Sequence, residues 1–189
     1  MERRERIFNA LFDAAEKGFT ALFSQHNEHF YYCALIMMET ATPCIAAISE
    51  ESLERVLNNY YSDELARNEN REYYKWSYAD SPYIGYGYED YFKEVEELFK
   101  NYVWKYYTDE TEFIKRANEW LEIMAEVMLE LDRKGVFNTN VDRSKLFINA
   151  ETQPPEDNSI NILNARKLNN ESLFTYWYED NRKEYEFEE

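Results

Sequence analysis

The sequence predicts an α+β fold in which an antiparallel sheet of about four or five strands has several helices packed against it. Apolar residues recur every three or four positions in several segments, the period of an amphipathic helix. Other short segments are continuously apolar and aromatic, which is typical of buried strands. Hairpins and helical pairs separate these strands, which favours antiparallel pairing over strict βαβ alternation. We expect residues 1–189 to form a single domain, because domains of about 200 residues are common.

The N-terminal half predicts two helices and three strands. Residues 2–23 place apolar side chains on one helical stripe. The segments 29–38 (HFYYCALIMM) and 43–48 (PCIAAI) predict a β-hairpin joined by the turn ETAT. Ser49 is a good N-cap for a helix over EESLERVLNNYY. After a polar stretch, residues 73–77 (YYKWS) predict a short strand.

The C-terminal half predicts mainly helices. Apolar residues at spacings of four and three indicate a helix over residues 88–102. Thr108 can cap a longer helix, which Gly135 ends as a glycine C-cap. A further strand is expected at residues 144–151 and a shorter helix at residues 159–168, followed by a tail.

Charge is the strongest global signal. Asp and Glu number 38 against 21 Lys and Arg, a formal net charge of −17. Nucleic-acid binding depends on Lys and Arg, so we expect no direct contact with DNA or RNA. The same charge disfavours anionic membranes and steers a basic partner toward the protein. The alternative, that the charge only keeps the protein soluble, stays open.

The sequence also predicts the compartment. The longest apolar run, residues 30–38, is far shorter than the ~20 residues that a membrane helix needs. The first residues lack the apolar core and cleavage site of a signal peptide. Cys33 and Cys44 both lie in apolar surroundings, which indicates buried thiols. We therefore expect a cytoplasmic protein without a membrane association.

Catalytic signatures are missing from the sequence. It contains no GxSxG, glycine-rich phosphate loop, HExxH or CxxC motif, so we expect neither an enzyme nor a bound cofactor. His26, His29 and Cys33 have the only metal-like spacing, yet zinc needs three or four converging ligands, and we expect no metal. Acidic clusters such as KEVEELF are explained by a solvated helix face.

Residues 75–90 (KWSYADSPYIGYGYED) are the best candidate for a binding segment. Ser, Asp, Pro and Gly favour turns, and Tyr and Trp are enriched at binding hot spots. The candidate partner-binding residues are Trp76, Tyr78, Asp80, Tyr83, Tyr86, Tyr88, Glu89 and Asp90. The alternative is that Trp76 and Tyr83 only anchor this loop to the core.

A family resemblance runs along nearly the whole chain. FYYCALIM, ISEESLERV, KWSYADSPYIGYGYEDYFKEVEELF, LDRKGVF, LFINAETQPPEDN and NARKLN occur in that order. Together they resemble the bacterial domain of unknown function family 4303, which implies an α+β fold and transfers no catalytic residues. Two departures are Lys75, where the family usually has Arg, and Ser81, where it usually has a Trp before Pro. Relatives look like small domains found near secreted bacterial toxins.

These observations lead to one expected function and two alternatives. We expect a cytoplasmic immunity protein that binds and neutralises a cognate toxin, a basic one such as a nuclease. The first alternative is a regulatory domain that binds a small molecule in a pocket near Trp76, Asp80 and Tyr83. The second is an enzyme with an unfamiliar carboxylate site, which only the abundance of Asp and Glu supports.

Overall fold

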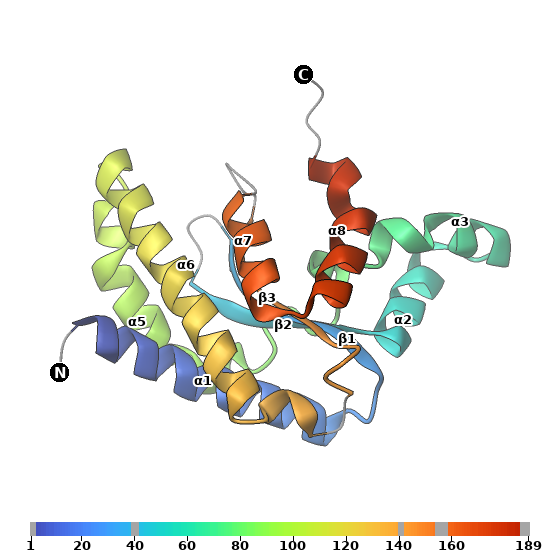
Figure 1. The fold of residues 1–189 in the computed structure, drawn as a ribbon, viewed down its shortest axis with the longest axis horizontal. Coiled ribbons are helices and arrows are strands. Elements are labelled where there is room, and N and C mark those ends of the chain that lie inside the picture. Colours follow the sequence, from blue (N-terminus) through green and yellow to red (C-terminus); the bar gives the residue numbers. More distant parts are fainter. Residues whose placement is uncertain (1–2, 39–41, 140–141, 154–158, 186–189) are drawn as a thin grey trace.

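The computed structural model describes residues 3–38, 42–139, 142–153 and 159–185 (Figure 1). The α+β class is confirmed: a three-stranded sheet lies among α-helices. The elements are α1 (Arg3–Gln25), β1 (Phe30–Met38), β2 (Cys44–Ser49), α2 (Glu50–Tyr60), α3 (Glu64–Tyr74), η1 (Tyr78–Asp80), α4 (Tyr88–Tyr91), α5 (Lys93–Tyr102), η2 (Trp104–Tyr106), α6 (Glu110–Arg133), η3 (Val136–Asn138), β3 (Phe147–Gln153), α7 (Ser159–Leu168) and α8 (Glu171–Tyr185).

The sheet is mixed and has the order β2-β1-β3 within the described residues. β1 and β2 form the expected antiparallel hairpin, with Leu35 opposite Ile45. The ETAT turn that joins them lies largely outside the described residues. β3 pairs with β1 in parallel, with Leu35 opposite Ala150. The prediction of an antiparallel sheet of four or five strands was therefore wrong, because β3 returns to the sheet through a long helical connection.

The expected strand at residues 73–77 is also absent from this sheet. Asp63 accepts a hydrogen bond from Ala66 N at 3.0 Å and so begins α3 in the polar stretch. That helix continues to Tyr74, and the chain then turns into η1. An N-cap and good helix formers thus outweigh the strand preference of two tyrosines.

Other helix boundaries follow local capping. Ser49 caps α2 as expected, in a capping box with Ser52. Asp109 rather than Thr108 caps α6, by accepting from Glu112 N at 3.2 Å. The expected helix over residues 88–102 is interrupted at Phe92, which separates α4 from α5. Helix α7 spans Ser159–Leu168 as expected, and the tail after it is helical as α8.

Alternating side chains of the strands define two faces of the sheet. We name the first face by Cys33, Leu35 and Met37 of β1, which join a large apolar cluster. We name the second face by Tyr32 and Ile36, which join a smaller cluster rich in aromatic side chains. The two cysteines are free and buried on opposite faces, Cys33 on the first and Cys44 on the second.

Long helices cover the first face. Figure 1 shows α1 running below the sheet while α8 stands on its opposite side. Helices α1, α5 and α6 supply the side chains that fill this core, including Phe19, Phe99 and Trp120. Where α1 crosses β2 it carries Gly18, and a Cβ there would meet Ile45 Cδ1 at 2.8 Å. Glycine thus lets the helix approach the sheet closely.

Groups from other segments form hydrogen bonds with the backbone at both edges of the sheet. On the β3 edge, Asn161 and Asn169 each both donate to and accept from the strand backbone, at Thr152 and Ile148 respectively. On the β2 edge, Ser81 Oγ donates to the Ala47 carbonyl at 2.6 Å. Gly85 N donates to the Ile45 carbonyl at 2.9 Å. Covered edges prevent further strand pairing with other chains.

Candidate functional site

The segment around residues 75–90 wraps the β2 edge, so its predicted contact residues reach both faces of the sheet. Trp76 and Tyr78 pack on the second face beside Tyr32, with ring centroids 6.1 Å from it in each case. Tyr78 is buried, whereas Trp76 is half-buried. Asp80 is half-buried in η1, where its carboxylate accepts from Ser77 Oγ at 2.7 Å.

The later tyrosines of the segment pack on the other side of this edge, against the first-face core. Tyr83 is buried, and its ring lies 5.5 Å from that of Phe30. Its hydroxyl accepts from Arg55 at 2.9 Å, and burial raises its pKa to about 12. Tyr86 is half-buried, and Tyr88 is half-buried and touches both clusters.

Glu89 and Asp90 are exposed on the short helix α4. The eight predicted residues therefore do not form one continuous patch. Trp76 and Tyr78 belong to the second face, Tyr83 and Tyr86 belong to the first-face side, and Tyr88 touches both clusters. Tyr83 takes the role of a core anchor, which was the alternative expectation for this loop.

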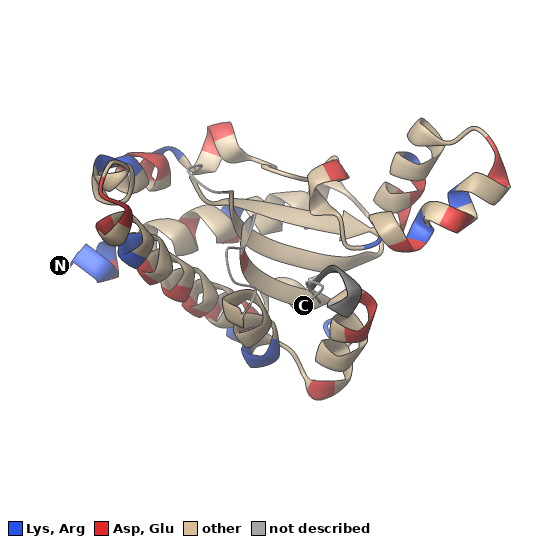
Figure 2. Ribbon diagram, turned by 90° about the horizontal axis from the view of Figure 1, so that it is seen from above, with Lys and Arg blue, Asp and Glu red and all other residues tan. Residues whose placement is uncertain are grey.

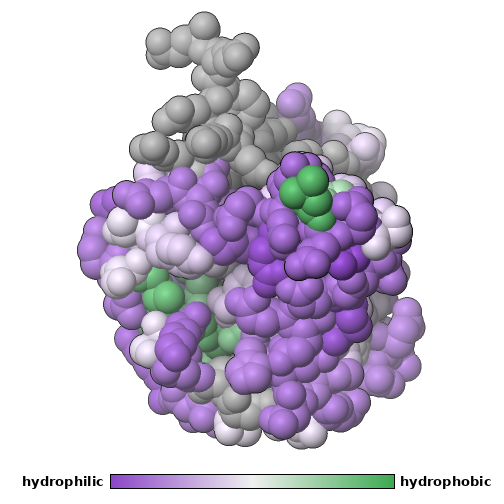
Figure 3. All heavy atoms as spheres, turned by 90° about the vertical axis from the view of Figure 1, so that its right-hand side faces the viewer, coloured by the Kyte–Doolittle hydropathy of each residue, from purple (hydrophilic) through white to green (hydrophobic). Residues whose placement is uncertain are grey.

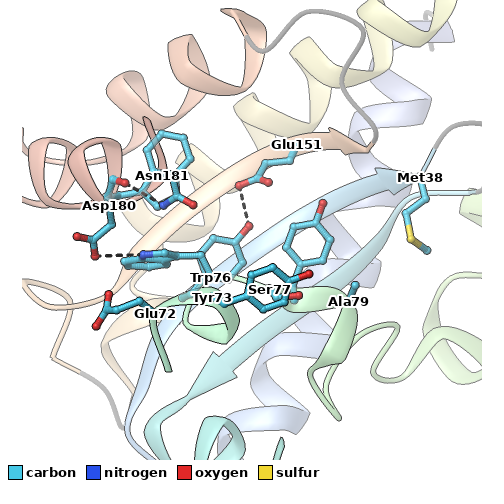
Figure 4. Close-up of a pocket in the computed structure, with 12 residues that line it drawn as sticks. Met38, Glu72, Tyr73, Trp76, Ser77, Ala79, Glu151, Asp180 and Asn181 are labelled. Atoms are coloured by element: carbon cyan, nitrogen blue, oxygen red, sulfur yellow. Dashed lines mark hydrogen bonds between the residues drawn. The ribbon is translucent and has the colours of Figure 1, made fainter. Parts of the chain in front are cut away.

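A cavity of about 270 Å³ opens on the second face beneath the start of this segment. Figure 4 shows the side chains that surround it. They come from β1, β3, α3, η1, α8 and the turn between α3 and η1, so segments distant in the sequence meet here. The lining residues are Tyr32, Met38, Glu72, Tyr73, Trp76, Ser77, Tyr78, Ala79, Glu151, Trp177, Asp180 and Asn181.

Glu151 is the most unusual group of this cavity. It is the only charged residue in the three strands, all of which lie within the described part of the chain. Only 3% of its surface is exposed. Its Oε1 accepts from the Tyr32 hydroxyl at 2.7 Å and from Asn149 Nδ2 at 2.8 Å. Burial raises the pKa of this carboxyl, and the two hydrogen bonds counteract part of that rise.

An ion-pair network forms one rim of the cavity. Asp180 of α8 accepts hydrogen bonds from Lys75 Nζ and, at 3.3 Å, from Trp76 Nε1. Lys75 Nζ also lies 3.4 Å from Glu72 and 4.5 Å from the centre of the Tyr176 ring. Although burial alone lowers the pKa of Lys75, its bond to Asp180 raises it overall. The ammonium therefore stays charged and fixes the Trp76 indole against α8.

A second cavity has a volume of about 360 Å³. Trp76 lines both cavities, and Tyr31 supports its backbone by donating to the Lys75 carbonyl at 2.5 Å. Asp80 and Tyr83 line neither of them. The residues of the second cavity are His29, Phe30, Tyr31, Glu50, Lys75, Trp76, Asp142, Lys145, Phe147, Leu173 and Tyr176.

The metal-like spacing in the sequence does not produce a cluster. Cys33 is buried on the first face, while His29 is exposed and its ring lies 2.6 Å from Glu51. His26 packs against the Tyr83 ring. Across the described ranges, no group of three or more His, Cys, Asp and Glu side chains could hold a metal ion. In the same ranges, no helix combines the length and apolarity needed to cross a membrane.

The cavity residues Tyr32, Glu151, Trp177 and Asp180 were not among the predicted site residues. One local signal could have found Glu151: in FINAE, Phe147, Asn149 and Glu151 alternate with two apolar residues, so polar groups point to one face of a buried strand. Trp177 and Asp180 lie in the segment that was expected to be a tail. No sequence pattern connects them to Tyr32.

The fold and the cavity define a class of protein: an α+β domain with a three-stranded mixed sheet and aromatic cavities on one face. The chain belongs to the family described as Domain of unknown function (DUF4303), which matches residues 11–170. The resemblance seen in the sequence is thereby confirmed. Neither the curated proteins nor the solved structures contain a significant match to the chain. The family description names no activity, ligand or partner.

Proposed function

We propose that this protein is a cytoplasmic immunity protein that binds and neutralises a cognate basic toxin. The observation that carries the proposal is the joint exposure of aromatic and acidic side chains around α2, α3 and α8. Tyr60, Tyr73 and Tyr176 each expose half or more of their surface. Exposed large hydrophobic residues elsewhere on the described surface include Trp104, Tyr107 and Leu163.

The acidic side chains near these tyrosines support a basic partner. Glu50 and Glu54 of α2 pair with Arg71, Glu72 of α3 lies beside Lys75, and the side chain of Glu72 is still 74% exposed. Figure 3 shows this end of the molecule as mostly hydrophilic, with isolated hydrophobic side chains. Figure 2 places Asp and Glu along the helices around the sheet. Aromatic anchors within an acidic surface fit a partner with exposed Lys and Arg.

The experiment begins with the tagged protein purified from its native host at low and then moderate salt. A stoichiometric basic protein identified by mass spectrometry is then expressed with and without this protein. We expect co-expression to restore growth. A partner whose toxicity this protein does not relieve would contradict the immunity role.

Charge reversal then tests the predicted contact acids. Glu89→Lys with Asp90→Lys should slow association with the isolated partner about tenfold at low salt and less at high salt, because screening removes steering. Asp80 is left unchanged in this test, because its carboxylate also accepts a hydrogen bond from Ser77 and so stabilises the turn. The control is Glu97→Lys with Glu122→Lys, two exposed acids on α5 and α6. Equal rates for both pairs would remove Glu89 and Asp90 from the interface.

The cavities favour a second candidate function, a regulatory domain that binds a small molecule beside Trp76. Trp76 forms a wall of both cavities, which supports this part of the expected pocket. Asp80 and Tyr83 are not part of this proposal because they line neither cavity. A ligand would raise the midpoint of thermal unfolding, with a stabilisation that grows as RT ln(1 + [L]/Kd).

A further inference from the structure

We infer that the cavity above Glu151 binds a guanidinium cation, with the Glu151 carboxylate as its counter-ion. This inference deepens the second proposed function by naming the chemical class of the ligand. It does not require that the protein is an immunity protein. A guanidinium group could come from a free small molecule or from an arginine side chain of a partner, and both present the same planar cation.

The charge of the lining residues points to a cation. Three of the twelve residues, Glu72, Glu151 and Asp180, carry carboxylates. Lysine and arginine are absent from this set of described residues. Lys75 lies outside the set and pairs with the two rim acids, Glu72 and Asp180. Glu151, at the floor, is thus the carboxylate that a ligand would meet.

One carboxylate oxygen of Glu151 can still accept a hydrogen bond, which favours a ligand that carries a hydrogen-bond donor. Both of its hydrogen-bond donors, Tyr32 and Asn149, bind the same oxygen, Oε1. Among the described residues, no hydrogen bond reaches Oε2. Figure 4 shows the Glu151 side chain extending from β3 toward the other side chains that line the cavity. A buried carboxylate is costly unless a cation or donors compensate it, and a ligand N–H at Oε2 would do so.

The walls of the cavity favour guanidinium among cations. Tyr32, Trp76, Tyr78 and Trp177 contribute aromatic rings to the lining. Guanidinium is planar, weakly hydrated and able to stack on aromatic faces while donating in its plane to a carboxylate. An ammonium ion is compact and strongly hydrated, so it loses more on entering such a cavity. The volume of about 270 Å³ leaves room for the group and its stem.

The test uses two pairs of probes that differ only in charge at the head group. N-acetyl-arginine amide is compared with N-acetyl-citrulline amide, and N-butylguanidinium with N-butylurea, all at matched ionic strength. Binding is followed by the indole N–H signals of Trp76 and Trp177 in ¹H–¹⁵N spectra, assigned with Trp76→Phe and Trp177→Phe. We expect each cation to bind at least about tenfold more tightly than its neutral counterpart, as for a charge-assisted hydrogen bond.

Glu151→Gln tests the assigned counter-ion. The amide keeps the shape and can keep the acceptor for Tyr32 and Asn149, so we expect folding with loss of the preference for cations. Glu97→Gln on the exposed face of α5 removes the same charge at a distance and should keep the preference. A preference that survives in a folded Glu151→Gln variant would overturn the assignment. The comparison in the unmodified protein remains decisive if this variant does not fold.

The outcomes separate this inference from the proposed functions. Equal binding of cationic and neutral probes would overturn the guanidinium inference but leave the ligand-binding function in place. Binding of none of the four probes would also overturn the guanidinium inference, and the ligand-binding function would then be decided by thermal unfolding with ligands of other chemical classes. Preferential binding of the arginine derivative would identify a protein side chain as the source, whereas preferential binding of N-butylguanidinium would identify a free small molecule. The co-expression experiment with a toxin is independent of all these results.

Discussion

The two faces of the sheet differ in what fills them. On the first face, long helices bury a continuous apolar core in which Phe19, Phe137 and Trp120 are fully buried. On the second face, aromatic rings alternate with polar groups such as Asn149 and Glu151, and two cavities remain. The strands supply both sets of side chains in alternation. The difference indicates that the first face stabilises the fold, while the second leaves room for a ligand.

The helices explain why the faces differ. Helices α1 and α6 lay extended apolar stripes along the sheet, and their buried side chains join one large apolar cluster. On the second face η1 and the helices α2, α7 and α8 each contribute only a few buried side chains to the smaller cluster. Their junction at Trp76 is held by Asp180 and Lys75 rather than by apolar contacts alone. Both cavities described above have Trp76, which lies at this polar junction, in their lining.

The largest effect is expected from truncation of a phenylalanine on each face. Phe137→Ala should lower the free energy of unfolding by about 3–5 kcal/mol, because a fully buried ring against Phe19 leaves a cavity. Phe174→Ala should cost at least about 1 kcal/mol less, since two of its neighbours, Tyr178 and Arg166, are exposed and can move to close the gap. Urea denaturation measures both. Equal losses would refute the difference in packing between the faces.

An intermediate effect is expected from Glu151→Gln, and it depends on pH. Burial raises the folded-state pKa of Glu151, so the folded protein holds this proton more tightly than the unfolded chain. The stability of the native protein therefore falls as pH rises from the unfolded pKa of about 4.3 through the folded value. Glutamine does not titrate, so the Glu151→Gln variant does not lose this stability. The loss that it avoids is about 1.4 kcal/mol for each pH unit between the unfolded and the folded pKa of Glu151.

Urea denaturation from pH 4 to pH 8 checks this prediction. The variant should gain stability relative to the native protein as pH rises, and the gain should level off above the folded pKa. The exposed acid Glu97, changed to Gln, should show no such trend. If the native protein instead gained on the variant with rising pH, the carboxylate would be stabilised in its ionised form by the fold.

The smallest effect on stability is expected at the cavity rim. Tyr73→Ser removes a side chain that is 68% exposed, so the free energy of unfolding should change by no more than about 0.5 kcal/mol. Because Tyr73 lines the cavity, binding of N-acetyl-arginine amide should weaken while the fold persists. A stability loss as large as that of Phe174→Ala would show that the rim belongs to the core.

Much of the fold could be predicted because its signals are local. The hairpin of β1 and β2, the cap at Ser49 and the end of α6 near Gly135 depend on neighbouring residues, and the structure confirms each of them. The parallel pairing of β3 with β1 could not be predicted, since either direction buries the same side chains. The helix α8 was not predicted, because its Trp and Tyr residues do not follow one clear helical period in the sequence. In the structure Trp177 is buried by stacking on Phe147 of β3, a contact that the sequence does not reveal.

The candidate site divides in the same way. The sequence by itself determined that residues 75–90 would contain turns, that their aromatic rings would either pack or face a partner and that the protein would be acidic, because these properties follow from composition and local turn chemistry. Only the tertiary structure decided which rings line a cavity. Tyr32 and Glu151 are 119 positions apart, and they meet because β1 and β3 are adjacent in one sheet. The surroundings of the Glu151 carboxylate are therefore set by the segments that the fold packs over β3, and these segments are distant from it in the sequence.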